Sequence, residues 1–260
     1  MLCLAIVEVY FYLQIQVIEQ IHIDSDIGST TVEIDFDIDL PSISCLNTQV
    51  VAEDVIQKST TDITEQTALK AIGESGCNVV GKVRIQKETG SVHISLLEPK
   101  LRRKDDPVEI KFDDLLHYNA THRINHLSFG QFFPGIDNPL DGVFKIVENG
   151  AAQFQYHIKV VPTVYKTLDG KNITSNQFSV TQYTKPLAKP EFGIFNRQGI
   201  FIPGLYLKYE FSPIVIEKSE VKSTLLQLIT RLFALLGGTF AAAGLLDSFV
   251  YHSMRAKKLD

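Results

Sequence analysis

The sequence predicts a mainly β protein, in which an antiparallel β-sandwich over residues 22–222 is flanked by an apolar segment at each end. Three observations support this prediction. Apolar side chains concentrate at the two ends of the 260-residue chain. Between the ends, several short runs alternate apolar and polar residues with a period of two, which is typical of strands. Glycine and proline separate these runs, as they do at turns.

The first apolar segment covers residues 1–21 and begins MLCLAIVEVYFYLQIQVI. Glu8 interrupts it, and it lacks the basic start and the small-residue cleavage site of a signal peptide. A complete spanning helix needs roughly 20 apolar residues. We therefore expect this segment to form part of a first transmembrane segment. The alternative is a buried strand, because aromatic and β-branched residues are frequent in it.

Residues 31–40, TVEIDFDIDL, alternate strictly between apolar and acidic side chains. Such a strand has one face on a core and the other in water. Four carboxylates share the polar face: Glu33, Asp35, Asp37 and Asp39. A calcium loop places its ligands on a turn with glycine, so we interpret the row as a solvated face and predict no metal site.

Further strands are expected along the middle of the chain. Residues 82–96 are predicted to form a hairpin around Glu88-Thr89-Gly90. Residues 154–183 are predicted to form two strands joined across Asp169-Gly170. Residues 199–218 give another pair of strands, with prolines at the bends.

Two stretches depart from this pattern. Residues 59–72 have a helical periodicity, with Ser59 or Thr60 as a possible cap. Residues 122–142 are too irregular for a strand and too apolar for a disordered linker. We expect them to form a packed loop, and loops of this kind often carry function.

The second apolar segment, residues 223–251, is predicted to be a transmembrane helix. Its central part, LFALLGGTFAAAGLL, has no charged side chain, and Arg231 and Asp247 lie at the two sides of it. The alternative is a buried core helix. Small residues recur at a spacing of four, which lets helices approach closely in lipid. They are Gly237, Gly238, Ala241, Ala242 and Gly244.

Residues 252–260 follow the helix as a short basic tail. Arg255, Lys257 and Lys258 place this tail in the cytosol by the positive-inside rule, so the chain before the helix is expected in a lumen. Two glycosylation sequons, at Asn119 and Asn172, agree with this orientation.

The cysteines also agree with a lumen. Cys45 and Cys77 are the only cysteines of the β region, and an oxidising lumen favours a disulfide between them. By chain entropy such a bond contributes roughly 3 kcal/mol. The alternative is two free buried thiols. Cys3 lies in the first apolar segment and is interpreted as a packing residue.

Several classes of function are not supported. The net charge is −5 and no basic stripe is present, so we expect no nucleic-acid partner. The chain has no C-x-x-C, G-x-S-x-G, H-E-x-x-H or phosphate loop. We therefore predict neither an enzyme nor a cofactor.

A series of motifs occurs in a fixed order: HRINHLSFGQFFPGIDNPLDG (122–142), FQYHIKVVPT, NQFSVT and GLYLKYEFSPI. The series resembles the ER–Golgi intermediate compartment protein family, the two-subunit cargo receptors of ER vesicles. The resemblance runs from Glu8 to GGTFAAAGLLDSFVYHS (237–253). The motif residues in the loop are His126, Phe129, Gly130, Pro134, Gly135, Asn138 and Pro139.

The resemblance implies a lumenal β-sandwich, two membrane spans and both termini in the cytosol. PGIDNPLDG and DSFVYHSMRAKK are closer to the larger subunit. The sequence departs from that subunit in lacking its clustered cysteines. The cytosolic N-terminal segment and half of the first span are also missing, so we expect a shortened N-terminus.

The resemblance further implies a membrane cargo receptor subunit of the ER, the intermediate compartment and the cis-Golgi. Its partners would be a paired family subunit, COPI and COPII coats, and escaped ER-resident clients. Lys257 and Lys258, fourth and third from the end, would be a dilysine signal for COPI retrieval; the alternative is a basic anchor of the span. The alternative function is a structural subunit that stabilises a partner and binds no cargo.

Family resemblance also implies pH-dependent client binding. Histidine changes charge in the required interval. His117, His122 and His126 lie close together in the sequence, so we predict that one or more of them sense pH. The alternative is that they are ordinary loop or core histidines.

Overall fold

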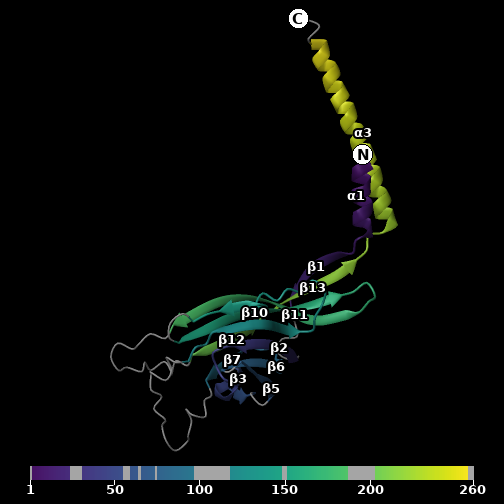
Figure 1. Cartoon of the computed structure of the whole chain (residues 1–260). Coiled ribbons are helices and arrows are strands. Elements are labelled where there is room, and N and C mark those ends of the chain that lie inside the picture. The colour runs from purple at the N-terminus through teal and green to yellow at the C-terminus, as the bar shows by residue number, and fades with distance from the viewer. Residues whose placement is uncertain are drawn as a thin grey trace, which may run out of the picture. The chain divides into compact units, whose positions relative to one another are not determined.

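The computed structural model describes residues 2–23, 31–54, 59–63, 66–73, 75–96, 118–147, 151–186 and 203–256. These residues form two compact units. One unit contains both helices, the first part of β1, the segment Lys166–Asn172 and the end of β13, and the other contains the remaining strands (Figure 1).

The helical unit is built from the two terminal apolar segments. Helix α1 (Leu2–Leu13) packs against helix α3 (Leu225–Ala256). The stretch Leu225–Phe249 of α3 is long and apolar enough to cross a membrane, and none of it is buried within the chain. The predicted C-terminal span therefore coincides with a helix of sufficient length.

Strand β1 (Gln16–Ile23) follows α1 and pairs with β13 (Ile214–Val221). The prediction of a transmembrane segment over residues 1–21 is therefore wrong for residues 16–21, which are extended. The physical reason is that this part of the segment carries polar side chains that find partners on β13. Glu19 of β1 forms an ion pair with Lys218 of β13, at 3.1 Å. The short first helix ends before these polar residues.

The β domain contains the other strands. In chain order they are β2 (Thr31–Leu40), β3 (Thr48–Asp54), β4 (Ser59–Asp62), β5 (Thr67–Ile72), β6 (Gly76–Gln86), β7 (Gly90–Leu96), β8 (His122–Gly130), β9 (Val143–Lys145), β10 (Ala152–Lys166), β11 (Asn172–Pro186) and β12 (Gly204–Phe211). A short 3-10 turn, η1 (Cys45–Asn47), precedes β3. This content confirms the predicted mainly β fold.

The strand order is β4-β3-β7-β12-β10-β11-β8-β2-β6-β5, with β9 beside β8. Strands β11 and β8 pair over only two residue pairs, Ser175 with Gly130 and Asn176 with Phe129. The strands form one continuous 13-stranded sheet. It folds back at the β11–β8 corner, so that its two halves are the two sheets of a sandwich around one shared apolar core. One pair departs from the predicted antiparallel arrangement, because β10 and β12 run parallel over eight residue pairs, from Gln153–Gly204 to Val160–Phe211.

Both sheets contribute to one apolar core. The alternation of β2 is as predicted, since Phe36 and Ile38 are 0 % exposed and the acidic residues lie on the outer side. The Phe36 ring lies over Gly81, its register partner on β6. A Cβ at Gly81 would come within 2.6 Å of that ring, so this position requires glycine.

Residues 82–96 do not form the predicted hairpin. Strand β6 pairs with β2 and β5, whereas β7 pairs with β3 and β12, so Lys87–Thr89 carry the chain from one sheet to the other. Val83 of β6 and Val92 of β7 then reach the same core from opposite sheets. Residues 199–218 contain two strands as predicted, but the strands do not pair with each other, because β12 joins β10 and β7 while β13 joins β1 and β10.

Residues 59–72 are strands β4 and β5 instead of the predicted helix. They pair with β3 and β6 at the two ends of the strand order. Threonine recurs in this stretch, at Thr60, Thr61 and Thr67, and β-branched residues favour strands. Pairing with an existing sheet edge therefore prevails over the weak helical periodicity.

Residues 122–130 form strand β8, so the predicted loop is wrong for the first part of 122–142. A β-bulge explains why the pattern looked irregular. Asp37 of β2 pairs with His126 and Ile38 pairs with Ile124, which leaves Asn125 as the extra residue. The bulge reverses the inward and outward alternation, so Asn125 and His126 both face outward.

Candidate functional site

The candidate site is the motif segment, residues 122–142, which consists of β8 and the turns after it. Asp141 fastens these turns to the strand. Its Oδ1 accepts a hydrogen bond from the Leu127 backbone N–H at 2.9 Å. Its Oδ2 lies 3.0 Å from His126 Nδ1 and accepts a bond from Asn138 Nδ2 at 3.4 Å.

His126 lies between a carboxylate and a hydroxyl. Since an ionised Asp141 can only accept, Nδ1 of His126 carries the proton and donates it. The other nitrogen, Nε2, lies 3.1 Å from Ser128 Oγ. The side chain is 42 % exposed, so solvent protons reach it. A protonated ring would turn this hydrogen bond to the carboxylate into an ion pair and would strengthen the attachment of the turns.

The other motif residues hold the segment in shape. Phe129 is 1 % exposed and packs edge-on against Phe178, with the ring centroids 5.4 Å apart. Its carbonyl accepts from Asn176 Nδ2 at 3.0 Å, which supports the corner between β8 and β11. Gly130 and Gly135 have φ angles of 95° and 81°, a backbone region that favours glycine.

The turns continue this division between inner and outer side chains. Phe133 is fully buried and stacks on Tyr165, with centroids 5.3 Å apart. Phe132 beside it is 78 % exposed. Pro134 and Pro139 lie in the turns, where their restricted φ suits the backbone. The inner face of the segment thus packs against the core, and His126 and Phe132 are exposed on its outer face.

His122 belongs to the core and not to this outer face. It is 0 % exposed. Nδ1 donates to the Ala120 carbonyl at 2.9 Å, so Nε2 accepts from the Tyr156 hydroxyl at 2.7 Å. Burial lowers the pKa of His122 to about 4, and the positive charge of Lys145 acts in the same direction. His122 therefore stays neutral in mild acid, and the structure favours the core-histidine alternative for it.

The acidic row on β2 forms ion pairs and hydrogen bonds with neighbouring strands. Lys82 lies 2.6 Å from Asp35, and Arg84 lies 3.6 Å from Glu33. Asn78 and the bulge residue Asn125 each donate to both of the remaining carboxylates, Asp37 and Asp39. Within the described part of the chain, no group of three or more His, Cys, Asp or Glu residues is placed to hold a metal ion.

The remaining predicted sites lie apart from the motif segment. The structure contains the Cys45–Cys77 disulfide, which ties η1 to the start of β6. Asn172 is exposed at the start of β11, whereas Asn119 is half-buried. His117, Lys257 and Lys258 lie outside the described residues.

Sequence reasoning missed Asp141 as a site residue. Asp141-Gly142 was interpreted only as a turn signal. In the structure, the Asp141 carboxylate makes hydrogen bonds with His126, Leu127 and Asn138. The available signal was an acidic residue fifteen positions after a histidine of a suspected loop. That signal is too weak to use without the fold, because any turn can contain an aspartate.

Comparisons with known proteins agree with the motif series. The chain matches the family described as endoplasmic reticulum vesicle transporter over residues 47–247. It is 37 % identical over 187 residues to the probable endoplasmic reticulum-Golgi intermediate compartment protein 3 of Dictyostelium discoideum. That alignment covers 71 % of this chain and 48 % of the relative, so the chain spans about half of that relative's length.

Two further similarities extend over more of the matched proteins. The chain is 26 % identical over 267 residues to endoplasmic reticulum-Golgi intermediate compartment protein 1 of Danio rerio, covering 99 % of this chain and 85 % of the relative. It resembles the crystal structure of Erv41p with a TM-score of 0.59 and 25 % identity, covering 78 % of this chain and 100 % of that one. The resemblance seen in the motifs is thereby confirmed, and the chain belongs to the endoplasmic reticulum vesicle transporter family.

Proposed function

We propose that this chain is a membrane cargo receptor subunit that cycles between ER and Golgi and retrieves escaped ER-resident proteins in COPI vesicles. It would reside in the membranes of the ER, the intermediate compartment and the cis-Golgi. This proposal rests on two features of the chain. The β domain contains an internal disulfide, Cys45–Cys77, and it is followed in the sequence by a helix, Leu225–Phe249, that is apolar and long enough to span a membrane. Disulfides persist in oxidising compartments, so this arrangement supports a lumenal binding domain.

The proposed partners follow from the same topology. A paired family subunit would lie beside the chain in the membrane, and clients would bind the lumenal domain. COPI and COPII coats would act from the cytosol. We propose a subunit of the larger type, on the motifs PGIDNPLDG and DSFVYHSMRAKK. No catalytic activity is proposed, since the similar proteins are named for compartments and vesicles.

The tail provides the first test, as Lys257 and Lys258 are the proposed dilysine signal. The full chain and a Lys257→Ser, Lys258→Ser form are expressed in cells, and their locations are compared by immunofluorescence and fractionation. The mutant is expected to move from the ER to the Golgi or later compartments. A Lys70→Ser, Lys171→Ser form loses the same charge in the β domain and is expected to stay with the parent. An unchanged location of the tail mutant would contradict the retrieval signal.

A second candidate is a structural subunit that stabilises its partner and binds no cargo. Gly237, Gly238 and Gly244 on α3 have no heavy atom within 4 Å of an added Cβ, which supports an open face for another helix. Crosslinking of clients to this chain in cells without the paired subunit separates the two. Recovered clients support the receptor, and their absence supports the structural subunit.

His126 is the proposed pH sensor of the receptor, since it is exposed and faces Asp141 at 3.0 Å. His126→Gln is expected to reduce the difference in client recovery between about pH 6 and about pH 7.4, the interval in which histidine changes charge. His22→Gln, another exposed histidine, is the matched control and should retain the difference. The same pH dependence in His126→Gln and the parent would exclude this residue.

A further inference from the structure

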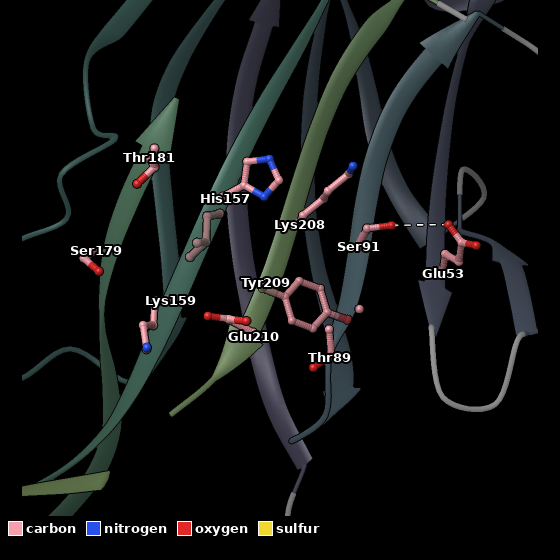
Figure 2. Close-up of a pocket in the computed structure, with 12 residues that line it drawn as sticks. Glu53, Thr89, Ser91, His157, Lys159, Ser179, Thr181, Lys208, Tyr209 and Glu210 are labelled. Atoms are coloured by element: carbon pink, nitrogen blue, oxygen red, sulfur yellow. Dashed lines mark hydrogen bonds between the residues drawn. The ribbon is translucent and has the colours of Figure 1, made fainter. Parts of the chain in front are cut away.

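A groove of about 620 Å³, with charged and hydroxyl side chains along it, crosses the outer face of the sheet formed by β3, β7, β12, β10 and β11 (Figure 2). None of its side chains was predicted as a site. They are the outward partners of core residues, as His157 and Lys159 flank buried Ile158 on β10. In the same way, Lys208 and Glu210 flank buried Tyr209 on β12.

The strand register sets the charges of this groove in rows. His157 lies opposite Lys208, and Lys159 lies opposite Glu210, in the parallel β10–β12 pair. The first row continues through Ser91 on β7 to Glu53 on β3. Four adjacent strands thus present glutamate, serine, lysine and histidine side by side, as Figure 2 shows.

Among the residues that the structure describes, Glu53 has a hydrogen-bond partner, whereas the central Lys208 forms no ion pair. Glu53 Oε2 accepts from Ser91 Oγ at 3.5 Å, and Glu210 faces Lys159 across the strands. Lys208 Nζ donates to the neutral amide oxygen of Gln155 at 3.4 Å. Its cross-strand neighbour His157 becomes a second cation when protonated, and like charges at such positions repel. An anion between them would relieve this repulsion.

We propose that the groove binds an acidic peptide segment of a client protein, with a carboxylate held between Lys208 and His157. The hydroxyls of Ser179 and Thr181 line the same groove and can donate to the peptide. The volume is within the range of ligand pockets. The inference rests on the proposed receptor function in one respect, namely that the peptide comes from a client protein.

The flanking carboxylates decide which anion fits. Glu53 on β3 and Glu210 on β12 lie on two sides of the central cations, and they would repel the continuous phosphates of a nucleic acid or an anionic membrane. A peptide can place one glutamate on the cations and neutral residues beside the carboxylates. The site therefore favours acidic residues separated by neutral ones.

Protonation adds a pH dependence to this binding. The groups that face His157 are Lys159 on its own strand, Lys208 and Glu210 on β12, and uncharged Ser179 and Thr181 on β11. Ser91 and Glu53 follow further along the row. A protonated His157 would add a positive charge to the groove beside Lys208, so the acidic peptide is expected to bind more tightly in mild acid.

The test uses the purified full chain in detergent micelles and a fluorescent peptide of alternating glutamate and serine, followed by anisotropy. The peptide is expected to bind, and a glutamine–serine peptide of the same length is expected not to. Lys208→Gln should weaken binding about ten-fold, the effect of one lost charge-assisted bond. Lys70→Gln removes the same charge from exposed β5 and should leave binding unchanged.

The pH arm of the test isolates the histidine. His157→Gln should bind equally at about pH 6 and about pH 7.4, whereas the parent binds more tightly at the lower value. Equal binding of the two peptides, or equal losses in Lys208→Gln and Lys70→Gln, would overturn the proposal. Binding of the glutamate peptide together with an unchanged location of the tail mutant would separate this site from the retrieval function.

Discussion

His122 and His126 are four positions apart on one strand, yet they have opposite environments. His122 is fully buried between the Ala120 carbonyl and the Tyr156 hydroxyl. His126 is exposed because the bulge at Asn125 moves the rest of β8 out of step. From the sequence pattern, both residues are equally good candidates for a pH sensor. Only the bulge separates a core histidine from a surface one.

The buried histidine predicts a pH dependence of stability. Its pKa is lowered from 6.5 to about 4 in the folded chain, chiefly by burial. The unfolded chain therefore binds a proton that the folded chain does not, at pH values between these two. His122 is therefore expected to contribute about 3 kcal/mol of stability above pH 6.5, and this contribution is lost as the pH is lowered from 6.5 through about 4.

The measurement is chemical unfolding of the full chain in detergent at several pH values between those limits. A His122→Phe, Tyr156→Phe double variant removes both partners of the buried bond, so it should lose this part of the pH slope. His126→Gln is the control and should keep it. A double variant with the slope of the parent would show that other groups cause the acid sensitivity.

At the scale of elements, an ion pair joins the two helices. Arg231 Nη1 of α3 lies 3.8 Å from Glu8 Oε2 of α1. The sequence treats these residues separately, Glu8 as an interruption and Arg231 as the charged end of a span. Packing of α1 on α3 brings them together, and the pair reduces the penalty for a charge in each apolar helix.

Breaking this pair is expected to loosen α1. Glu8→Gln and Arg231→Gln should each raise the hydrogen-exchange rates of α1 amides about five-fold, which corresponds to about 1 kcal/mol. The double variant should exchange no faster than either single one, because the two residues form one interaction. Asp247→Asn changes another charge on α3 and serves as the control. Additive effects of the two substitutions would mean that the residues act independently.

For the whole molecule, the two sequons differ in accessibility. Asn172 is exposed after the turn that joins β10 and β11, where the Gly170 amide donates to the Thr167 carbonyl at 3.0 Å. Asn119 Oδ1 instead accepts from the Thr121 amide at 2.9 Å, and Thr121 Oγ1 accepts from the Val147 amide at 3.0 Å. A glycan at Asn119 would disturb this arrangement.

We therefore expect a glycan at Asn172 and none at Asn119 when the chain is made in cells. Asn172→Gln should remove the single endoglycosidase-sensitive shift in gel mobility, and Asn119→Gln should leave it. A glycosidase-sensitive shift that depends on Asn119 would contradict the folded geometry. The lack of any shift would contradict the lumenal orientation of the β domain.

Sequence alone determined the mainly β class, the inward face of β2, the long apolar helix near the end and the family. These properties are local or collinear, because a strand's period and a helix's hydropathy lie within one window of residues. The tertiary structure decided the strand partners, the bulge at Asn125, the Asp141 attachment and the Glu8–Arg231 pair. It also assembled the groove from strands far apart in the chain. These contacts join residues that are far apart in the sequence, and they form only when the two sheets pack on one shared core. A short window of sequence therefore does not predict them.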